Sequence, residues 1–267
     1  MKNISILGCG WLGFPLAKAL LETGFQVNGS TTSTDKISKL EKAGIHPFII
    51  SLETDRVHGA IEDFLNDSSI LIIDIPPKLR GVNKENFVTK IEALIPFIEK
   101  STIENVLFIS STSVYGDDNE LVTEETILNP DSEGGKQLVL VEALLQSNTH
   151  FKTTVLRFGG LIGEDRHPIH FLSGRGNIDN PDAPINLIHQ IDCIGIILRV
   201  IEKKSWGEIY NAAAPAHPSR EVYYTQKALE LNIAPPMFNH NQASIRKTIV
   251  ADKLIAKLNY RFAVMDL

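Results

Sequence analysis

Short apolar runs alternate with helix-like segments along the first 157 residues, and this alternation constrains the fold more than any other feature. The apolar runs are Ile4–Leu7, Phe25–Asn28, Pro47–Ile50, Ile70–Ile75, Val106–Ile109 and Thr153–Leu156. The helical segments between them are Leu12–Thr23, Asp35–Lys42, Val57–Asn66, Asn83–Lys100 and Lys136–Gln146. Several runs are continuously apolar, as strands buried on both faces are. Repeated strand–helix units imply parallel strands with right-handed crossovers, so the sequence predicts a doubly wound α/β sheet.

The strand–helix alternation ends after Arg157. Residues 158–184 form a loop-like stretch rich in Gly, Pro and charged residues. A helix at Gln190–Lys203 and a strand at Glu208–Ala212 return to the sheet, and helices are expected at Arg220–Leu231 and Ala251–Leu258. We therefore expect residues 1–158, with 190–212, to form one domain. Residues 159–189 and 213–267 are expected to form a small lobe over the carboxyl ends of the strands, where open α/β sheets bind ligands.

Composition excludes several classes of function. The 267 residues carry a net charge of −6 and no basic cluster, which argues against nucleic acid as a partner. No apolar run reaches the roughly 18 residues that a membrane helix needs, and the N-terminus enters a strand directly. Two cysteines, Cys9 and Cys193, give no disulfide framework, so a cytoplasmic location is expected. The histidines lack metal-ligand spacing, and no metal site is expected.

The segment "ILGCGWLG" places three glycines in GxGxxG spacing between the first strand and the first helix. In this context Gly8 permits the tight turn, Gly10 lets a diphosphate approach the backbone, and Gly13 allows close packing of helix on strand. The helix N-terminus offers free amides to the phosphates. Trp11 and Leu12 are expected to pack, with their amides near the phosphates. The sequence thus predicts a Rossmann-type NAD(P) site.

The end of the second strand favours NADP over NAD. An NAD site usually has Asp or Glu there to bind the ribose diol, but no acid occurs from Gln26 to Thr34. Hydroxyls and an ammonium group can accept a 2′-phosphate. The candidate residues are Thr31, Thr32, Ser33 and Lys36. A solvated turn that caps the next helix is the alternative, and both can hold together.

Five ordered motifs resemble those of the extended short-chain dehydrogenase/reductases, the epimerase/dehydratase superfamily. They are "ILGCGWLG", "ISSTSVYG", "LRFGGLIGEDRHP", "INLIHQIDCIGIIL" and "GEIYNAAAPA", spread over most of the chain. The resemblance implies a nicotinamide cofactor and a small polar carbonyl or hydroxyl substrate, such as a nucleotide-linked sugar. It also implies a homodimer through the Asn83–Lys100 and Lys136–Gln146 helices. Further cofactor contacts implied by position are Ser51, Leu52, Ile75, Pro76, Pro77 and Ser110.

The catalytic residues depart from the family pattern. Ser111 falls on the position that binds the substrate oxygen, but Thr112 and Ser113 replace the acid pair of dehydratases. Alignment on Glu142 puts Gly134 and Leu138 where the family has its Tyr–Lys pair. The chain therefore resembles the atypical branch that has lost this pair. Tyr115 is interpreted as a structural tyrosine, with a substitute catalytic acid as the alternative.

The loop after Arg157 supplies the remaining candidates. Two arginines could grip a phosphate or carboxylate, and a histidine could act as acid or base near neutral pH; the alternative is a solvated loop. These substrate candidates are Arg166, His167, His170 and Arg175. His189 and Asp192 match a family motif that joins core and lobe, and we expect them to be structural.

Two hypotheses of function follow. The first is an NAD(P)-dependent oxidoreductase or epimerase in which Ser111 orients the substrate and a lid residue or water replaces the tyrosine. The second is a non-catalytic NAD(P)-responsive regulatory protein. The missing Tyr–Lys pair favours the second, whereas Ser111 and the lobe motifs favour the first. Neither substrate nor oligomeric state follows from the sequence.

Overall fold

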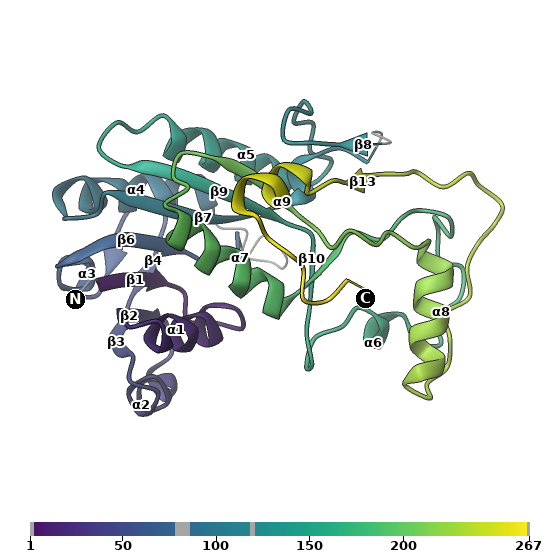
Figure 1. Ribbon diagram of the computed structural model, residues 1–267, viewed down its shortest axis with the longest axis horizontal. Coiled ribbons are helices and arrows are strands. Elements are labelled where there is room, and N and C mark those ends of the chain that lie inside the picture. The colour runs from purple at the N-terminus through teal and green to yellow at the C-terminus, as the bar shows by residue number, and fades with distance from the viewer. Residues whose placement is uncertain (1–2, 78–85, 118–120, 266–267) are drawn as a thin grey trace.

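The computed structural model describes residues 3–77, 86–117 and 121–265, and its centre is a sheet of seven parallel strands (Figure 1). The strand order is β12-β9-β7-β6-β1-β2-β3. The strands are β1 (Asn3–Leu7), β2 (Gln26–Thr31), β3 (His46–Ile49), β6 (Ser68–Ile73), β7 (Asn105–Ser111), β9 (Lys152–Phe158) and β12 (Ile209–Ala212). This is the predicted doubly wound, Rossmann-type sheet, and its order reverses between β1 and β6. Ligands of open α/β sheets bind at such a reversal.

The helices cover both faces of the sheet and give the protein two cores. One core lies under α1 (Gly13–Glu22), α2 (Ile37–Lys42), α7 (Gln190–Lys203) and α9 (Asp252–Leu258). The other lies under α3 (Ile61–Leu65), α4 (Phe87–Lys100) and α5 (Glu133–Gln146). Successive residues of strand β6 point into opposite cores. Ile70 and Ile72 lie in the first core, and Leu71 and Ile73 lie in the second. Burial on both faces explains the continuous apolar runs in the sequence.

The segment Val57–Asn66 differs from its prediction as one helix. It begins as strand β5 (Val57–His58), which pairs antiparallel with β4 (Ser51–Leu52), and only Ile61–Leu65 is helical. Gly59 separates the two with a φ of +101°, and a Cβ there would lie 2.0 Å from the carbonyl oxygen of Ile49. This left-handed backbone ends any continuous helix. The predicted start of the Asn83–Lys100 helix lies partly outside the described residues, and α4 begins after Asn86, whose side chain caps it.

A small lobe lies at the end of the molecule away from β2 and β3 (Figure 1). It contains β10 (Gly160–Ile162), β11 (Leu187–His189), the short α6 (Ile169–Leu172) and α8 (Arg220–Glu230), around a separate apolar cluster that includes Ile169, Tyr223 and Tyr224. The strand pair of β8 (Leu121–Val122) with β13 (Thr248–Ile249) lies beside it. Helix α9, by contrast, packs on the first core. The proposed domain boundaries stay a prediction.

Asp192 fastens the C-terminal segment to the main core. Its buried carboxylate accepts hydrogen bonds from Tyr260 Oη (2.9 Å) and from the amides of Ala263 (2.7 Å) and Val264 (3.0 Å). Nearby, His189 Nδ1 accepts from the Ile191 amide and caps α7. These contacts favour the structural interpretation of both residues. In the described part of the chain, no helix combines the length and apolar character needed to cross a bilayer.

A buried ion pair joins β9 to α5 beneath the carboxyl end of the sheet. Arg157 Nη2 lies 2.6 Å from Glu142 Oε2, and both side chains are at most 3% exposed. Ser110 donates to the same carboxylate, and Arg157 Nη1 donates to Tyr115 Oη (2.6 Å). Tyr115 in turn donates to Asn211 Oδ1 (2.8 Å). A network of this kind is costly to break, because each partner would leave a buried polar group unsatisfied.

We expect Glu142→Gln to destabilise the protein by about 3 kcal/mol or more, because Arg157 would keep its buried charge without a counter-charge. Urea unfolding measures the change. Glu202→Gln is the matched control, since Glu202 is exposed in its pair with Arg199 and its loss should barely move the midpoint. Equal midpoints for the two variants would contradict this account of the pair.

Candidate functional site

The glycine loop is pressed against the end of β6. Gly8 has a φ of +109°, and a Cβ on it would lie 2.3 Å from the carbonyl oxygen of Asp74. A Cβ on Gly13 would lie 2.2 Å from the carbonyl oxygen of Gly8, so helix α1 contacts the turn directly. A Cβ on Gly10, in contrast, would meet no atom within 4 Å. Gly8 and Gly13 thus serve packing, whereas Gly10 leaves space for a ligand.

Two backbone amides of the loop have no hydrogen-bond partner among the described residues. They belong to Trp11 and Leu12, at the start of α1. The Gly13 amide donates to the Asp74 side chain, and the Phe14 amide donates to the Gly10 carbonyl. Amides at a helix N-terminus carry partial positive charge. The loop therefore presents two adjacent donors beside the open space at Gly10, which suits a diphosphate.

A cavity of about 420 Å³ follows the carboxyl ends of β1, β2 and β6. Thr31 and Thr32 line it at the end of β2, and Lys36 lines it from the turn before α2. The other predicted cofactor residues in its wall are Gly8, Gly10, Ser51, Leu52, Ile75 and Pro76. One cavity thus joins residues from four separate loops at the point where the strand order reverses.

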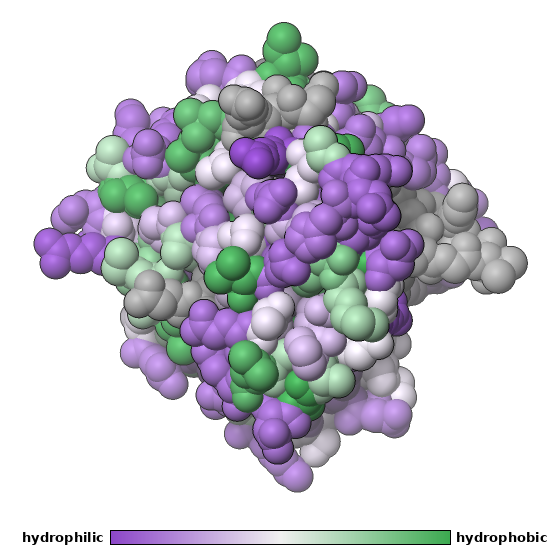
Figure 2. Space-filling model, turned by 90° about the vertical axis from the view of Figure 1, so that its right-hand side faces the viewer, coloured by the Kyte–Doolittle hydropathy of each residue, from purple (hydrophilic) through white to green (hydrophobic). Residues whose placement is uncertain are grey.

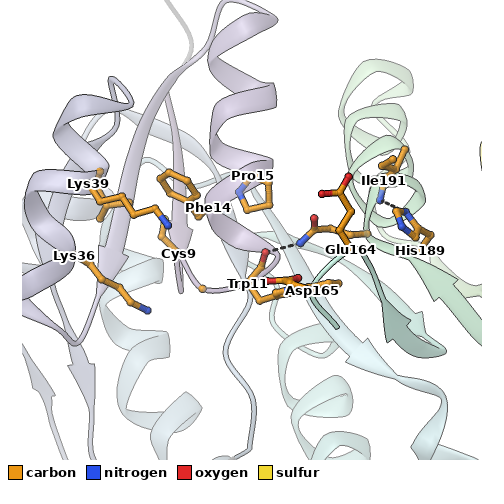
Figure 3. A pocket seen from close by; sticks show the side chains of 13 residues that line it. Cys9, Trp11, Phe14, Pro15, Lys36, Lys39, Glu164, Asp165, His189 and Ile191 are labelled. Carbon is orange, nitrogen blue, oxygen red and sulfur yellow. Dashed lines mark hydrogen bonds between the residues drawn. The ribbon is translucent and has the colours of Figure 1, made fainter. Parts of the chain in front are cut away.

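A second cavity of about 580 Å³ also borders the glycine loop (Figure 3). Lys36 and Lys39 form one wall, with the Lys39 ammonium 4.4 Å from the centre of the Phe14 ring. Glu164 and Asp165 of the lobe form the opposite wall. Cys9, Gly10 and Lys36 line both cavities. Lys36 therefore borders the end of β2, whereas Lys39 lines the larger cavity only.

The other predicted cofactor residues lie outside the smaller cavity. Trp11 lines the larger cavity, and the side chain of Leu12 is buried in the first core. Ser33 and Pro77 line neither cavity. Ser110 is buried and donates to Glu142, so its hydroxyl is directed away from a ligand.

The predicted catalytic residues are held by local structure. The Ser113 amide donates to Ser111 Oγ (3.1 Å), so Ser111 caps a short 3-10 turn, η2 (Thr112–Val114), at the end of β7. Tyr115 is 1% exposed, and its hydroxyl already contacts Arg157 and Asn211. Burial raises the pKa of its phenol. This placement favours the structural interpretation of Tyr115 over the catalytic one.

Helix α5 carries Gly134 and Leu138 at the positions implied for the Tyr–Lys pair. Leu138 is buried in the second core. Gly134 leaves open space, since a Cβ on it would meet no atom within 4 Å. The next residue, Gly135, contacts η2 so closely that a Cβ would lie 2.2 Å from the carbonyl oxygen of Ser113. Close packing of α5 on η2 therefore depends on glycine rather than on a functional side chain.

The four predicted substrate residues separate into different environments. His167 Nε2 lies 2.7 Å from Tyr223 Oη, and its Nδ1 accepts from the Ile169 amide (3.1 Å). Burial, with help from nearby positive charge, lowers the pKa of His167 to about 4, so the ring is neutral at pH 7. This does not suit an acid–base role near neutrality. His170 and Arg175 are exposed on the lobe, whereas Arg166 lies over the Trp11 ring.

Several residues of the site were missed by sequence reasoning. Lys39, Glu53, Phe87 and Lys90 line the cavities, and Asp165 binds the Trp11 indole. Of these residues, only Lys39 could have been predicted from the sequence. It follows the candidate Lys36 by three residues, and residues at this spacing lie on the same face of a helix. The others come from separate loops and helices that only the fold brings together.

Comparison with known proteins finds YeeZ proteins that match along the whole chain. The Escherichia coli protein YeeZ is 34% identical over 268 aligned residues, which cover all of this chain and 97% of YeeZ. The chain belongs to the YeeZ family. No family model matches it.

Solved structures share the fold of this YeeZ-family protein at lower identity. A conserved protein of unknown function from Silicibacter pomeroyi has a TM-score of 0.81 at 21% identity, over 100% of this chain and 95% of the other. UDP-glucuronic acid 4-epimerase from Bacillus cereus, solved with NAD, has a TM-score of 0.81 at 18% identity, over 98% and 92%. MoeE5, solved with UDP-glucuronic acid and NAD, has a TM-score of 0.78 at 16% identity, over 98% and 94%. The fold is therefore that of NAD-binding epimerases.

Asp74 places a titratable carboxyl group directly behind the glycine loop of this YeeZ-family protein. Burial raises its pKa to about 7, and the Gly13 amide and the Arg166 charge only partly offset that rise. An unfolded aspartate titrates near pH 3.9. Between about pH 4 and pH 7 the folded state therefore holds a proton that the unfolded state has lost, so this group makes stability fall as pH rises through that window.

We expect Asp74→Asn to remove this pH dependence, because the amide can still accept from Gly13 but cannot ionise. The stability of the variant relative to wild type should increase from pH 5 to pH 8, by at most about 1.4 kcal/mol per pH unit. Urea unfolding at both pH values measures it, with the exposed Asp182→Asn as the control. A difference that stays constant with pH would show that Asp74 is ionised throughout.

Proposed function

We propose that this protein binds NADP(H) along the carboxyl edge of its sheet. One observation carries the proposal: free amides at Trp11 and Leu12 and open space at Gly10 adjoin a 420 Å³ cavity at the strand-order reversal. In this assignment the diphosphate lies at the start of α1, and the adenosine half occupies the cavity lined by Ser51, Leu52 and Ile75. The epimerase structures of the same fold were solved with NAD, which agrees with a nicotinamide nucleotide.

The preference for the 2′-phosphate rests on charge. The end of β2 supplies Thr31 and Thr32, and Lys36 lines both cavities beside them. The carboxylates in the smaller cavity, Glu53 and Asp74, follow β4 and β6 and not β2. A ribose 2′-phosphate at the end of β2 would therefore meet hydroxyls and an ammonium group, which favour it.

The chemistry at the far end of the cofactor is proposed as reduction or epimerisation of a small polar or nucleotide-sugar-like substrate bound by the lobe. Ser111 would orient the substrate oxygen, and water or a lobe residue would carry the proton. A second candidate is a non-catalytic protein that responds to NADP(H). It is supported by Tyr115, whose hydroxyl is buried in a network, and by Leu138, which is buried at the position that the sequence resemblance implies for the lysine.

Titration of NADPH and NADH by nucleotide fluorescence tests the binding, and incubation with sugar nucleotides and aldehydes tests turnover. NADPH should bind more tightly than NADH. Oxidation of NADPH by any substrate of the panel supports the enzyme, whereas tight binding without turnover supports the second candidate. Failure to bind either nucleotide would refute the proposal as a whole.

Gly10→Val should weaken NADPH binding about tenfold or more, since the added side chain would fill the space left for the diphosphate. Its thermal midpoint should stay close to wild type, because a Cβ there meets no atom. Gly134→Val is the matched control: it also enters open space, on α5, and should leave binding unchanged. Unaltered NADPH affinity in the Gly10 variant would place the diphosphate elsewhere.

Lys36→Glu should reverse the nucleotide preference. Replacing an ammonium group with a carboxylate should weaken NADPH binding about tenfold or more, because the 2′-phosphate would be repelled, and should leave NADH binding nearly unchanged. Parallel titrations of both nucleotides measure this difference. Lys42→Glu, an exposed change of equal charge at the far end of α2, is the control. Equal losses for NADPH and NADH would argue against a 2′-phosphate at Lys36.

A further inference from the structure

Trp11 of the glycine loop contacts both the lobe and the start of α7. Its indole nitrogen donates to Asp165 Oδ1 (2.7 Å), and Gln190 Nε2 donates to its carbonyl oxygen (2.7 Å). Gly163 lies against the indole so closely that a Cβ would be 2.8 Å from Trp11 Cζ2. The segment 163–166 therefore has a fixed position relative to the amides of the loop.

Arg166 ends this segment with its guanidinium carbon 4.9 Å from the centre of the Trp11 ring. The side chain is exposed, and among the described residues no hydrogen bond or ion pair engages its guanidinium group. The neighbouring carboxylate of Asp165 is already bound to the indole of Trp11. The positive charge of Arg166 also reaches Asp74, behind the loop, where it opposes the rise in that group's pKa caused by burial.

We propose that Arg166 is a ligand of the cofactor's diphosphate and not, as the sequence suggested, of the substrate. The inference rests on the proposed NADP(H) site and adds to it a cation supplied by the lobe. The two free amides contribute only partial charges, and the carboxylate of Asp74 opposes an anion when ionised. A guanidinium stacked on Trp11 supplies a full charge and a planar pair of donors for phosphate oxygens.

Arg175 provides the contrast. It belongs to the same predicted substrate group and is also exposed, but its backbone hydrogen bonds join it to Leu172 and Met237 of the lobe. On the side of the molecule where the lobe lies, hydrophobic residues form small groups among hydrophilic ones (Figure 2). The two arginines thus share chemistry and exposure, but of the two only Arg166 stacks on the Trp11 ring.

The experiment compares Arg166→Gln with Arg175→Gln, using isothermal titration with three probes. NADP⁺ and ADP-ribose 2′-phosphate contain the diphosphate, whereas adenosine 2′-monophosphate lacks it. Arg166→Gln should weaken the first two about tenfold or more and change the third less than about twofold, as loss of a charge-assisted hydrogen bond predicts. Arg166→Lys should recover part of the affinity, since it keeps the charge without the planar fork. Arg175→Gln should change none.

Each other outcome overturns the inference in a distinguishable way. If Arg166→Gln binds NADP⁺ as tightly as the wild-type protein, Arg166 is not a ligand of the diphosphate, and its earlier assignment to the substrate stands. The proposed function would be unaffected. An equal loss for all three probes would show a general disturbance of Trp11 and its loop. Absence of NADP⁺ binding by the wild-type protein would refute the proposed function itself, and Arg166 would lose its assigned ligand.

Discussion

The site depends on the contact between the glycine loop and the end of β6. Without side chains at Gly8 and Gly13, the turn can lie against the backbone of Asp74, and this contact directs the first turn of α1 toward the strand-order reversal. The Asp74 carboxylate then holds the Gly13 amide, so Trp11 and Leu12 keep the adjacent free donors. A larger residue at either packing glycine would move both donors and the cavity wall.

A buried polar network lies behind the carboxyl end of the sheet, next to the predicted catalytic residue Ser111. Arg157, Glu142, Tyr115 and Asn211 form a buried chain of hydrogen bonds from β9 through α5 and η2 to β12. Every member of this network makes a hydrogen bond to another member. Among the described residues, Asn211 Nδ2 is the one buried polar side-chain atom without a hydrogen-bond partner. Such a network joins α5 to strands β9 and β12, and it leaves Tyr115 unable to reach a substrate without breaking two hydrogen bonds.

The sequence predicts the fold well because each signal is local. Continuous apolar runs identify the central strands, and the spacing of Gly8, Gly10 and Gly13 identifies the loop. The sequence did not predict the hairpin of β4 and β5. Each of its strands has two residues, which is too short for an alternation of apolar and polar residues to be recognised. The burial of Ser110 and the stacking of Arg166 on Trp11 join residues more than thirty positions apart, and no local pattern carries that information.

The distribution of charge around the glycine loop connects the proposed cofactor site to the lobe. Lys36 borders the end of β2, Lys39 lines the larger cavity beside it, and Arg166 of the lobe lies over Trp11 of the loop. Asp74 lies behind the loop, and burial raises its pKa to about 7. NADP(H) carries more negative charge than NAD(H) because of its 2′-phosphate. Its binding is therefore strengthened more by the three cations, and weakened more by the ionised carboxylate of Asp74. Arg166 belongs to the lobe, so the proposed site couples cofactor binding to the position of the lobe segment 163–166. An interaction that stabilises Arg166 over Trp11 would raise the affinity for the cofactor. Bound cofactor would in turn hold segment 163–166 in place.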